Sequence, residues 1–139
     1  MATWIKAGFW EKLCKPCQGY KGWLNLDQFV QDNALPYKVY SALLTQTGTD
    51  DPIPTVLQNT LGGDITWERT DIGNYVGTLL GAFPENKTFV ILTQGGGVVC
   101  ILNSLRISDD EVLYSSNNPI DTNPIDVQGL CQIEIRVYN

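Results

Sequence analysis

From residue 37 onward, short runs of β-branched, apolar and aromatic residues alternate with clusters of Gly, Pro, Asn and Asp. Such runs are typical of β-strands, and such clusters are typical of the turns between them. The short spacing and the lack of a long helical pattern between the runs favour antiparallel pairing in a sandwich or barrel. The predicted strands lie near 37–46, 54–61, 64–70, 73–80, 87–93, 97–105, 110–115 and 130–138.

Two kinds of strand are expected. Residues 65–68 and 132–137 alternate between apolar and polar side chains, with Trp67 on the apolar side. Because side chains two apart share a face of a strand, we expect Trp67 in the core. By contrast, residues 89–92 and 98–102 are apolar on both faces, which predicts that both faces are covered, by the domain itself or by another subunit.

Glycine and aspartate supply the backbone conformations that tight turns need, and three clusters of these residue types are expected to form hairpin turns. The tetrapeptide Asn-Pro-Ile-Asp occurs at 118–121 and again at 123–126, and we expect two successive turns there, because proline removes a donor that a sheet would use. The expected hairpin turns are Gly62-Gly63, Gly95-Gly96-Gly97 and Ser108-Asp109-Asp110.

The first 35 residues differ from the rest, because they carry three of the four tryptophans and most of the lysines but no sustained helix or strand period. Residues 25–30 combine capping-box spacing with three apolar residues on one helical face, which predicts a short helix that ends before Pro36. The sequence therefore predicts an aromatic-rich N-terminal arm at 1–35, followed by a mainly β domain at 36–139, an antiparallel β-sandwich or barrel-like fold.

The composition limits the classes of partner that we expect this chain to bind. The net charge is −6, and the nine Lys and Arg residues form no stripe, which argues against a nucleic-acid partner. No apolar run approaches the roughly 20 residues that span a bilayer, so no membrane partner is expected. The first ten residues do not have the pattern of a secretory signal, and synthesis in a reducing cytoplasm is the expectation.

The chain contains no histidine, which excludes Ser-His-Asp and Cys-His catalysis, so we expect no enzyme and no catalytic residue. Cys14-Lys-Pro-Cys17 could be a redox pair or half of a zinc site. A redox pair would lie between a strand and a helix, and a four-cysteine zinc site would need a second pair of closely spaced cysteines, but the sequence shows neither. Cys100 and Cys131 are single. We expect free or packed thiols, no metal and no cofactor, with a Cys14–Cys17 link or a metal shared between subunits as alternatives.

The aromatic residues of the arm are the candidate partner-binding residues. A segment of this length cannot bury several large rings by itself, and exposed aromatic clusters mark interfaces. As an alternative, Trp23 or Trp67 could stack on the sugar rings of a carbohydrate. The candidate partner-binding residues are Trp4, Phe9, Trp10, Tyr20 and Trp23.

The stretch Tyr37-Lys-Val-Tyr-Ser-Ala-Leu-Leu-Thr-Gln-Thr-Gly-Thr-Asp, together with residues 54–67, 71–79 and 83–89, resembles a segment that recurs in virion proteins of bacteriophages. The resemblance spans about residues 36–93 and is to modules of structural or appendage proteins in tailed phages of Bacteroidota hosts, including crAss-like phages. It carries no catalytic motif.

This resemblance implies a head-fibre, decoration or tail protein that is made in the host cytoplasm and located in the virion. The arm would bind other virion proteins of the capsid or tail lattice. The resemblance also implies a homo-oligomer, with a trimer favoured by the trimeric habit of phage fibres. The alternative is a receptor- or carbohydrate-binding module of a phage tail appendage.

Overall fold

The computed structural model describes residues 4–6, 23–25, 34–96, 99–126 and 129–139. The chain divides into two compact units, residues 1–35 and residues 36–139, and each is described by itself. Regular structure among the described residues consists of strands, and none of these residues forms a helix long and apolar enough to cross a membrane.

The first unit contains a short antiparallel ladder. Strand β1 (Trp4–Lys6) pairs with β2 (Trp23–Asn25), with Ile5 opposite Leu24. This ladder was not predicted from the sequence, because three residues are too few to show an alternating pattern. The short helix expected from 25–30 lies, beyond Asn25, outside the described residues.

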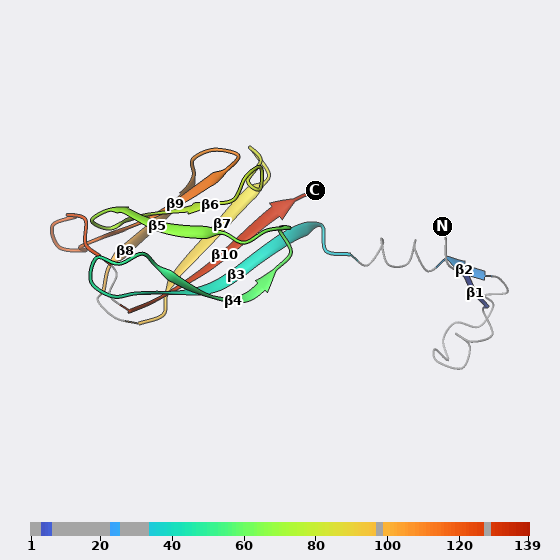
Figure 1. Cartoon of the computed structure of the whole chain (residues 1–139), viewed down its shortest axis with the longest axis horizontal. Coiled ribbons are helices and arrows are strands. Elements are labelled where there is room, and N and C mark those ends of the chain that lie inside the picture. Colours follow the sequence, from blue (N-terminus) through green and yellow to red (C-terminus); the bar gives the residue numbers. More distant parts are fainter. Residues whose placement is uncertain (1–3, 7–22, 26–33, 97–98, 127–128) are drawn as a thin grey trace. The chain divides into compact units, whose positions relative to one another are not determined.

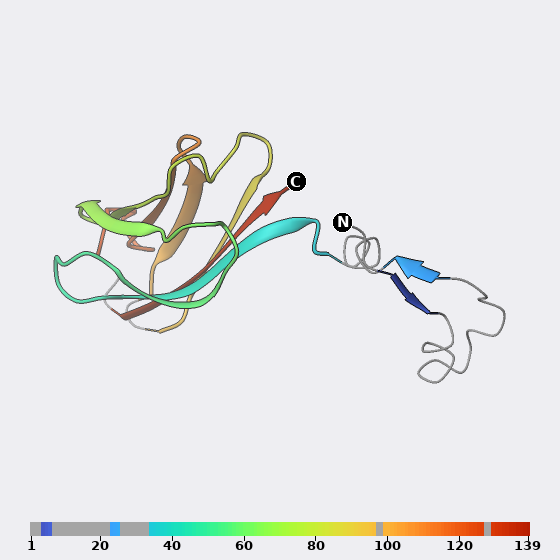
Figure 2. The ribbon, with the colours of Figure 1, turned by 45° about the vertical axis from the view of Figure 1, so that its right-hand side comes forward.

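The second unit is mainly β and consists of two four-stranded antiparallel sheets (Figures 1 and 2). One sheet has the strand order β4-β3-β10-β7, and the other has the order β5-β6-β9-β8. All eight strands overlap the ranges predicted from the sequence. Their bounds are β3 (Tyr37–Gln46), β4 (Ile53–Asn59), β5 (Thr66–Asp71), β6 (Asn74–Thr78), β7 (Thr88–Gln94), β8 (Ile101–Arg106), β9 (Glu111–Asn117) and β10 (Gly129–Tyr138).

The core lies between the two sheets, and alternation along the strands builds it. On β10 the odd-numbered residues 131–137 are buried, while the even-numbered residues between them are partly or fully exposed. Trp67 is 5% exposed, which confirms its predicted place in the core. The largest fully buried side chains include Tyr40, Tyr75 and Tyr114, which come from both sheets. The two sheets therefore share one core.

Two of the three expected hairpin turns are wrong. The segment with Gly62-Gly63 joins β4 to β5, and the segment with Gly95-Gly96 joins β7 to β8, so each connects strands of different sheets. Only Ser108-Asp109-Asp110 closes a hairpin, between β8 and β9. Turn residues specify the local backbone but not the sheet that the next strand enters, which depends on packing between distant segments.

The hairpin of β5 and β6 was not among the turns predicted from the sequence. Strands β5 and β6 are joined at Ile72-Gly73. Gly73 has φ 65°, and a Cβ atom there would lie 2.5 Å from the carbonyl oxygen of Ser116. Both the left-handed backbone and the close approach of a neighbouring strand therefore require glycine at this turn.

The two Asn-Pro-Ile-Asp copies have different structures. In the first, the Asn118 side chain accepts a hydrogen bond from the amide of Ile120 at 2.9 Å, and the expected turn forms. In the second, Pro124 forms an isolated bridge with Asn117, so the expected second turn is wrong. The second copy runs beside the end of β9, where the Ile125 amide donates a hydrogen bond to the Ser116 carbonyl at 3.0 Å.

The two segments that are apolar on both faces are covered within the chain on one face. On β7, Val90 and Leu92 pack against the core while Phe89 is 53% exposed. On β8, Leu102 packs inward while Ile101 is 43% exposed. The described residues of the domain therefore leave the outer faces of these two strands uncovered.

Candidate functional site

The five aromatic residues of the arm are placed only in part. Trp4 begins β1 and Trp23 begins β2, and the register sets Trp4 opposite Asn25 and Lys6 opposite Trp23. The structure therefore brings two of the five candidate residues into one ladder. The other three, Phe9, Trp10 and Tyr20, lie outside the described residues.

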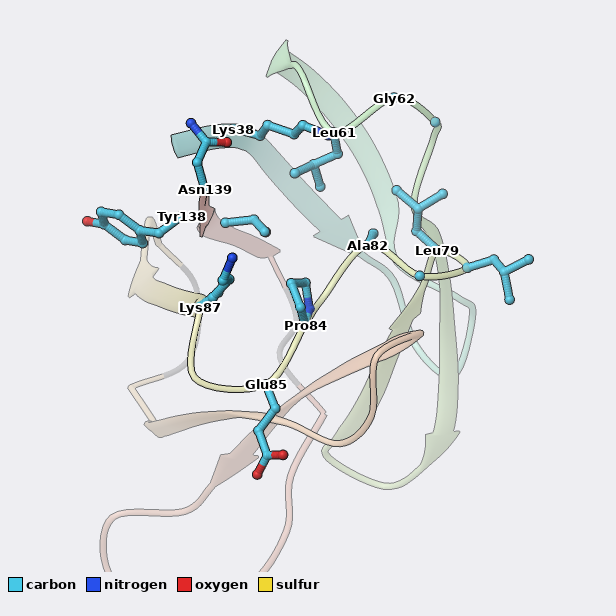
Figure 3. A pocket seen from close by; sticks show the side chains of 14 residues that line it. Lys38, Leu61, Gly62, Leu79, Ala82, Pro84, Glu85, Lys87, Tyr138 and Asn139 are labelled. Atoms are coloured by element: carbon cyan, nitrogen blue, oxygen red, sulfur yellow. The ribbon is translucent and has the colours of Figure 1, made fainter. Parts of the chain in front are cut away.

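The second unit has a hollow at the end where β3 begins and β10 ends (Figure 3). Its volume is about 370 Å³, and its walls come from the start of β3, the segments at 61–63 and 79–87, and the last residues of β10. Backbone hydrogen bonds fix this end, because the Tyr138 amide donates to the Lys87 carbonyl at 2.9 Å and the Asn139 amide donates to the Pro36 carbonyl at 3.1 Å. The hollow is thus part of the folded frame. Its apolar side chains are Leu61, Leu79, Leu80, Ala82, Pro84 and Val137.

Lys38 and Lys87 both line this hollow, and within the described residues neither makes an ion pair. The second unit has five basic residues and twelve acidic ones, and its three arginines are each paired with a carboxylate. The two unpaired cations of this acidic unit therefore meet at one hollow. Figure 3 shows the Lys87 side chain directed toward the hollow and the Glu85 side chain directed away from it. This arrangement suits a small anionic group.

The other notable polar cluster surrounds Asp126. Arg69 Nε lies 2.8 Å from Asp126 Oδ1 and Nη2 lies 3.0 Å from Oδ2, so the contact is bidentate. The amide of Gly73 donates to the same carboxylate at 3.0 Å, and the Tyr75 hydroxyl lies 3.1 Å from it. The Tyr75 hydroxyl is also 2.7 Å from the side-chain oxygen Oε1 of Gln46 on the facing sheet. The cluster links both sheets to the 118–126 loop.

The electrostatics of this cluster keep the carboxylate charged. The Arg69 guanidinium, with the Gly73 amide and the Tyr75 hydroxyl, lowers the pKa of Asp126 from its ordinary value, although burial acts in the opposite direction. The Asp126 carboxylate in turn raises the pKa of Arg69. Both oxygens of Asp126 are engaged, so the geometry is that of a structural ion pair and not of a proton-transfer group.

Asp126 was not predicted as a functional or structural site from the sequence. Other acidic residues have local roles: Asp51 accepts the Arg69 amide at 2.8 Å, and Asp110 accepts the Gly81 amide at 2.7 Å. The partner of Asp126 lies 57 residues away in the chain, and no local pattern reveals such a contact.

The described cysteines are packed thiols. Cys131 is 1% exposed, and burial raises its pKa to about 12. Burial also raises the pKa of Cys100. Residues 4–6, 23–25, 34–96, 99–126 and 129–139 contain no group of three metal-ligating side chains, but Cys14 and Cys17 lie outside these ranges.

Two features are thus candidates for function: the aromatic arm and the hollow with Lys38 and Lys87. Comparisons with protein-family models, curated proteins and solved structures found no match to this chain. A functional assignment therefore depends on the residues themselves and on their geometry.

Proposed function

We propose that this chain is a structural protein of a tailed-phage virion. Its N-terminal arm docks on the capsid or tail lattice, and its β domain is presented or assembles there, as in head fibres and decoration proteins. Two considerations support the proposal: the resemblance of residues 36–93 to modules of phage virion proteins, and the division of the chain into two units.

The observation that carries the proposal is the distribution of tryptophan between the two units. Trp67 belongs to the sandwich, where its indole N–H donates to the Tyr40 hydroxyl at 3.2 Å and its ring lies 5.7 Å from that of Tyr114. Every described member of the core cluster comes from residues 40–137. The described residues of the sandwich therefore form a core with aromatic side chains of their own, and we propose that the three tryptophans of residues 1–35 bind a partner.

Aromatic residues are effective anchors. Each ring can bury roughly 150–250 Å² at an interface, and a few anchors usually dominate the affinity. Because ordering a long arm opposes binding, the loss of one or two anchors should be decisive. Removal of two such anchors, Trp10 and Trp23, should therefore abolish docking.

The test is incorporation of the Trp10→Ala/Trp23→Ala variant into particles, quantified by mass spectrometry of purified virions. We expect incorporation to be lost while the circular dichroism of the sandwich is unchanged. The matched control is Phe89→Ala/Tyr138→Ala, which removes two aromatic side chains that are 53% and 41% exposed on the sandwich. Normal incorporation of the arm variant, or equal loss in the control, would contradict the docking role of the arm.

A second candidate function is recognition of an anionic saccharide by a tail appendage, and the hollow with Lys38 and Lys87 favours it. Two ammonium groups beside an apolar wall suit a sugar that carries a carboxylate or sulfate. An array of acidic glycans tests it with the Lys38→Ala/Lys87→Ala variant, and Lys12→Ala/Lys15→Ala in the arm as control. Selective binding that only the first variant abolishes would favour this function, and an array without selective binding would exclude it.

A further inference from the structure

The sandwich has two protected edge strands. Strand β4 contains Pro54, and its register against β3 shifts between Ser41 and Ala42. Strand β5 carries three charged residues, and its register against β6 shifts between Arg69 and Asp71. Proline, charge and bulges are the usual devices that stop another strand from adding to an edge. This side of the sandwich is therefore unsuited to strand pairing.

The opposite side lacks these devices. Strand β8 pairs only with β9 among the described strands, and its register against β9 is continuous, without a bulge. It contains no proline, and its single charge, Arg106, is engaged by the Phe83 carbonyl and the Asp109 carboxylate. The neighbouring edge strand β7 has one exposed large apolar side chain, Phe89, whereas β8 and the residues beside it have four. Strand β8 is thus the most open edge.

The exposed residues of β8 are arranged symmetrically about Asn103. Ile101 is 43% exposed and Leu105 is 55% exposed, two positions before and two after it. Farther out, Val99 and Ile107 are also exposed, again at equal separations from Asn103. The order apolar, apolar, amide, apolar, apolar therefore has the same pattern in either chain direction.

We infer that β8 pairs antiparallel with β8 of a second copy of this chain, with the two Asn103 residues opposite each other. In this register Ile101 lies opposite Leu105 of the second copy, and Val99 lies opposite Ile107. A shift of two residues would set Asn103 against an aliphatic side chain, and a shift of one would pair opposite faces of the strands. The symmetric pattern selects one register.

A second copy is the occupant that this edge fits best. Antiparallel addition of a strand satisfies the free backbone groups of the edge, and a two-fold pair uses the same surface on both chains. The outward residues of β8 carry no charge, so the net negative charge of the chain is not concentrated where the copies meet. The resemblance to phage fibres implies a trimer, whereas a self-paired edge closes as a dimer, and the molecular mass distinguishes the two.

The first experiment measures the mass of the full chain by light scattering at micromolar concentration. We expect twice the chain mass of 15.4 kDa, and the single chain mass for Leu105→Lys. The matched control is Ile53→Lys on β4, where the side chain is 68% exposed and the dimer should persist. A monomeric or trimeric native chain would overturn the inference, and so would a dimer that survives in Leu105→Lys.

The second experiment tests the register and does not depend on the folding of the lysine variant. Residues directly opposite on antiparallel strands have Cα atoms about 4.5–5.5 Å apart, within the range of a disulfide. We expect Asn103→Cys, in an otherwise native chain, to form a covalent dimer on mild oxidation and Leu105→Cys to form much less. Equal cross-linking of the two variants, or none in Asn103→Cys, would overturn the pairing. Neither readout involves virion incorporation, so this inference and the proposed function succeed or fail separately.

Discussion

Gly77 on β6 lies directly opposite Trp67 on β5, and the absence of a side chain at Gly77 makes room for the indole ring. A Cβ atom at Gly77 would lie 2.7 Å from two carbons of that ring. The ring also contacts Tyr114 on β9, the strand on the other side of β6. Gly77 therefore allows Trp67 to extend across one strand and join three strands of the sheet.

Gly77→Ala should destabilise the sandwich. A rigid, buried ring cannot move aside easily, and overpacking of a core costs roughly 1–3 kcal/mol in the free energy of unfolding. Urea unfolding followed by tryptophan fluorescence measures this cost. Thr78→Ala, at the next and exposed position of β6, is the control and should change the midpoint little. An unchanged midpoint for Gly77→Ala would show that the ring is not confined as described.

The Arg69–Asp126 pair should make stability depend on pH. Because the folded pKa of Asp126 lies below its ordinary value of 3.8, its contribution to stability is complete above that value and is lost as the pH falls through the lower, folded pKa. Urea midpoints measured from about pH 5 to about pH 2 should therefore fall more steeply for the native chain than for Asp126→Asn.

The repeated tetrapeptide offers a matched control for that experiment. Asp121 occupies in the first copy the position that Asp126 occupies in the second, but it is exposed and has no contact with Arg69. Asp121→Asn should keep the steep fall of the urea midpoint at low pH, because the Arg69–Asp126 pair is unchanged in this variant. Equal slopes for the native chain and Asp126→Asn would show that the ion pair does not contribute to this pH dependence.

Cys131 should resist alkylation in the folded protein. The thiolate is the reactive form, and a pKa of about 12 leaves very little of it at pH 8. Iodoacetamide labelling followed by peptide mass spectrometry should leave Cys131 unmodified until urea unfolds the sandwich. Cys100, which is less buried, serves as an internal reference and should react sooner. Rapid modification of Cys131 without denaturant would contradict its burial.

The sequence predicted the strands of the sandwich well because alternation is a local signal. Trp67 illustrates this: its place in the core follows from its phase with Ile65 alone. The assignment of strands to sheets was not predictable in this way, since Gly62-Gly63 has the composition of a hairpin turn but leads into the other sheet. That choice depends on which distant segments pack together.

The candidate sites also differ in whether a local sequence signal predicts them. The aromatic arm stands out in the sequence, because its composition differs from everything after Pro36. The hollow does not, since Lys38 begins one strand and Lys87 precedes another, and only the folded sandwich brings both to its wall. The same holds for Asp126, whose role depends on Arg69 of a distant strand.

The docking role that we propose for the arm requires that residues 36–139 fold without residues 1–35. The most direct test compares two-dimensional amide NMR spectra of residues 36–139 and of the full chain. We expect the fragment to give dispersed signals that superpose on those of the sandwich in the full chain. A fragment spectrum typical of a disordered chain would contradict the claim, because residues 1–35 would then be part of the folded core.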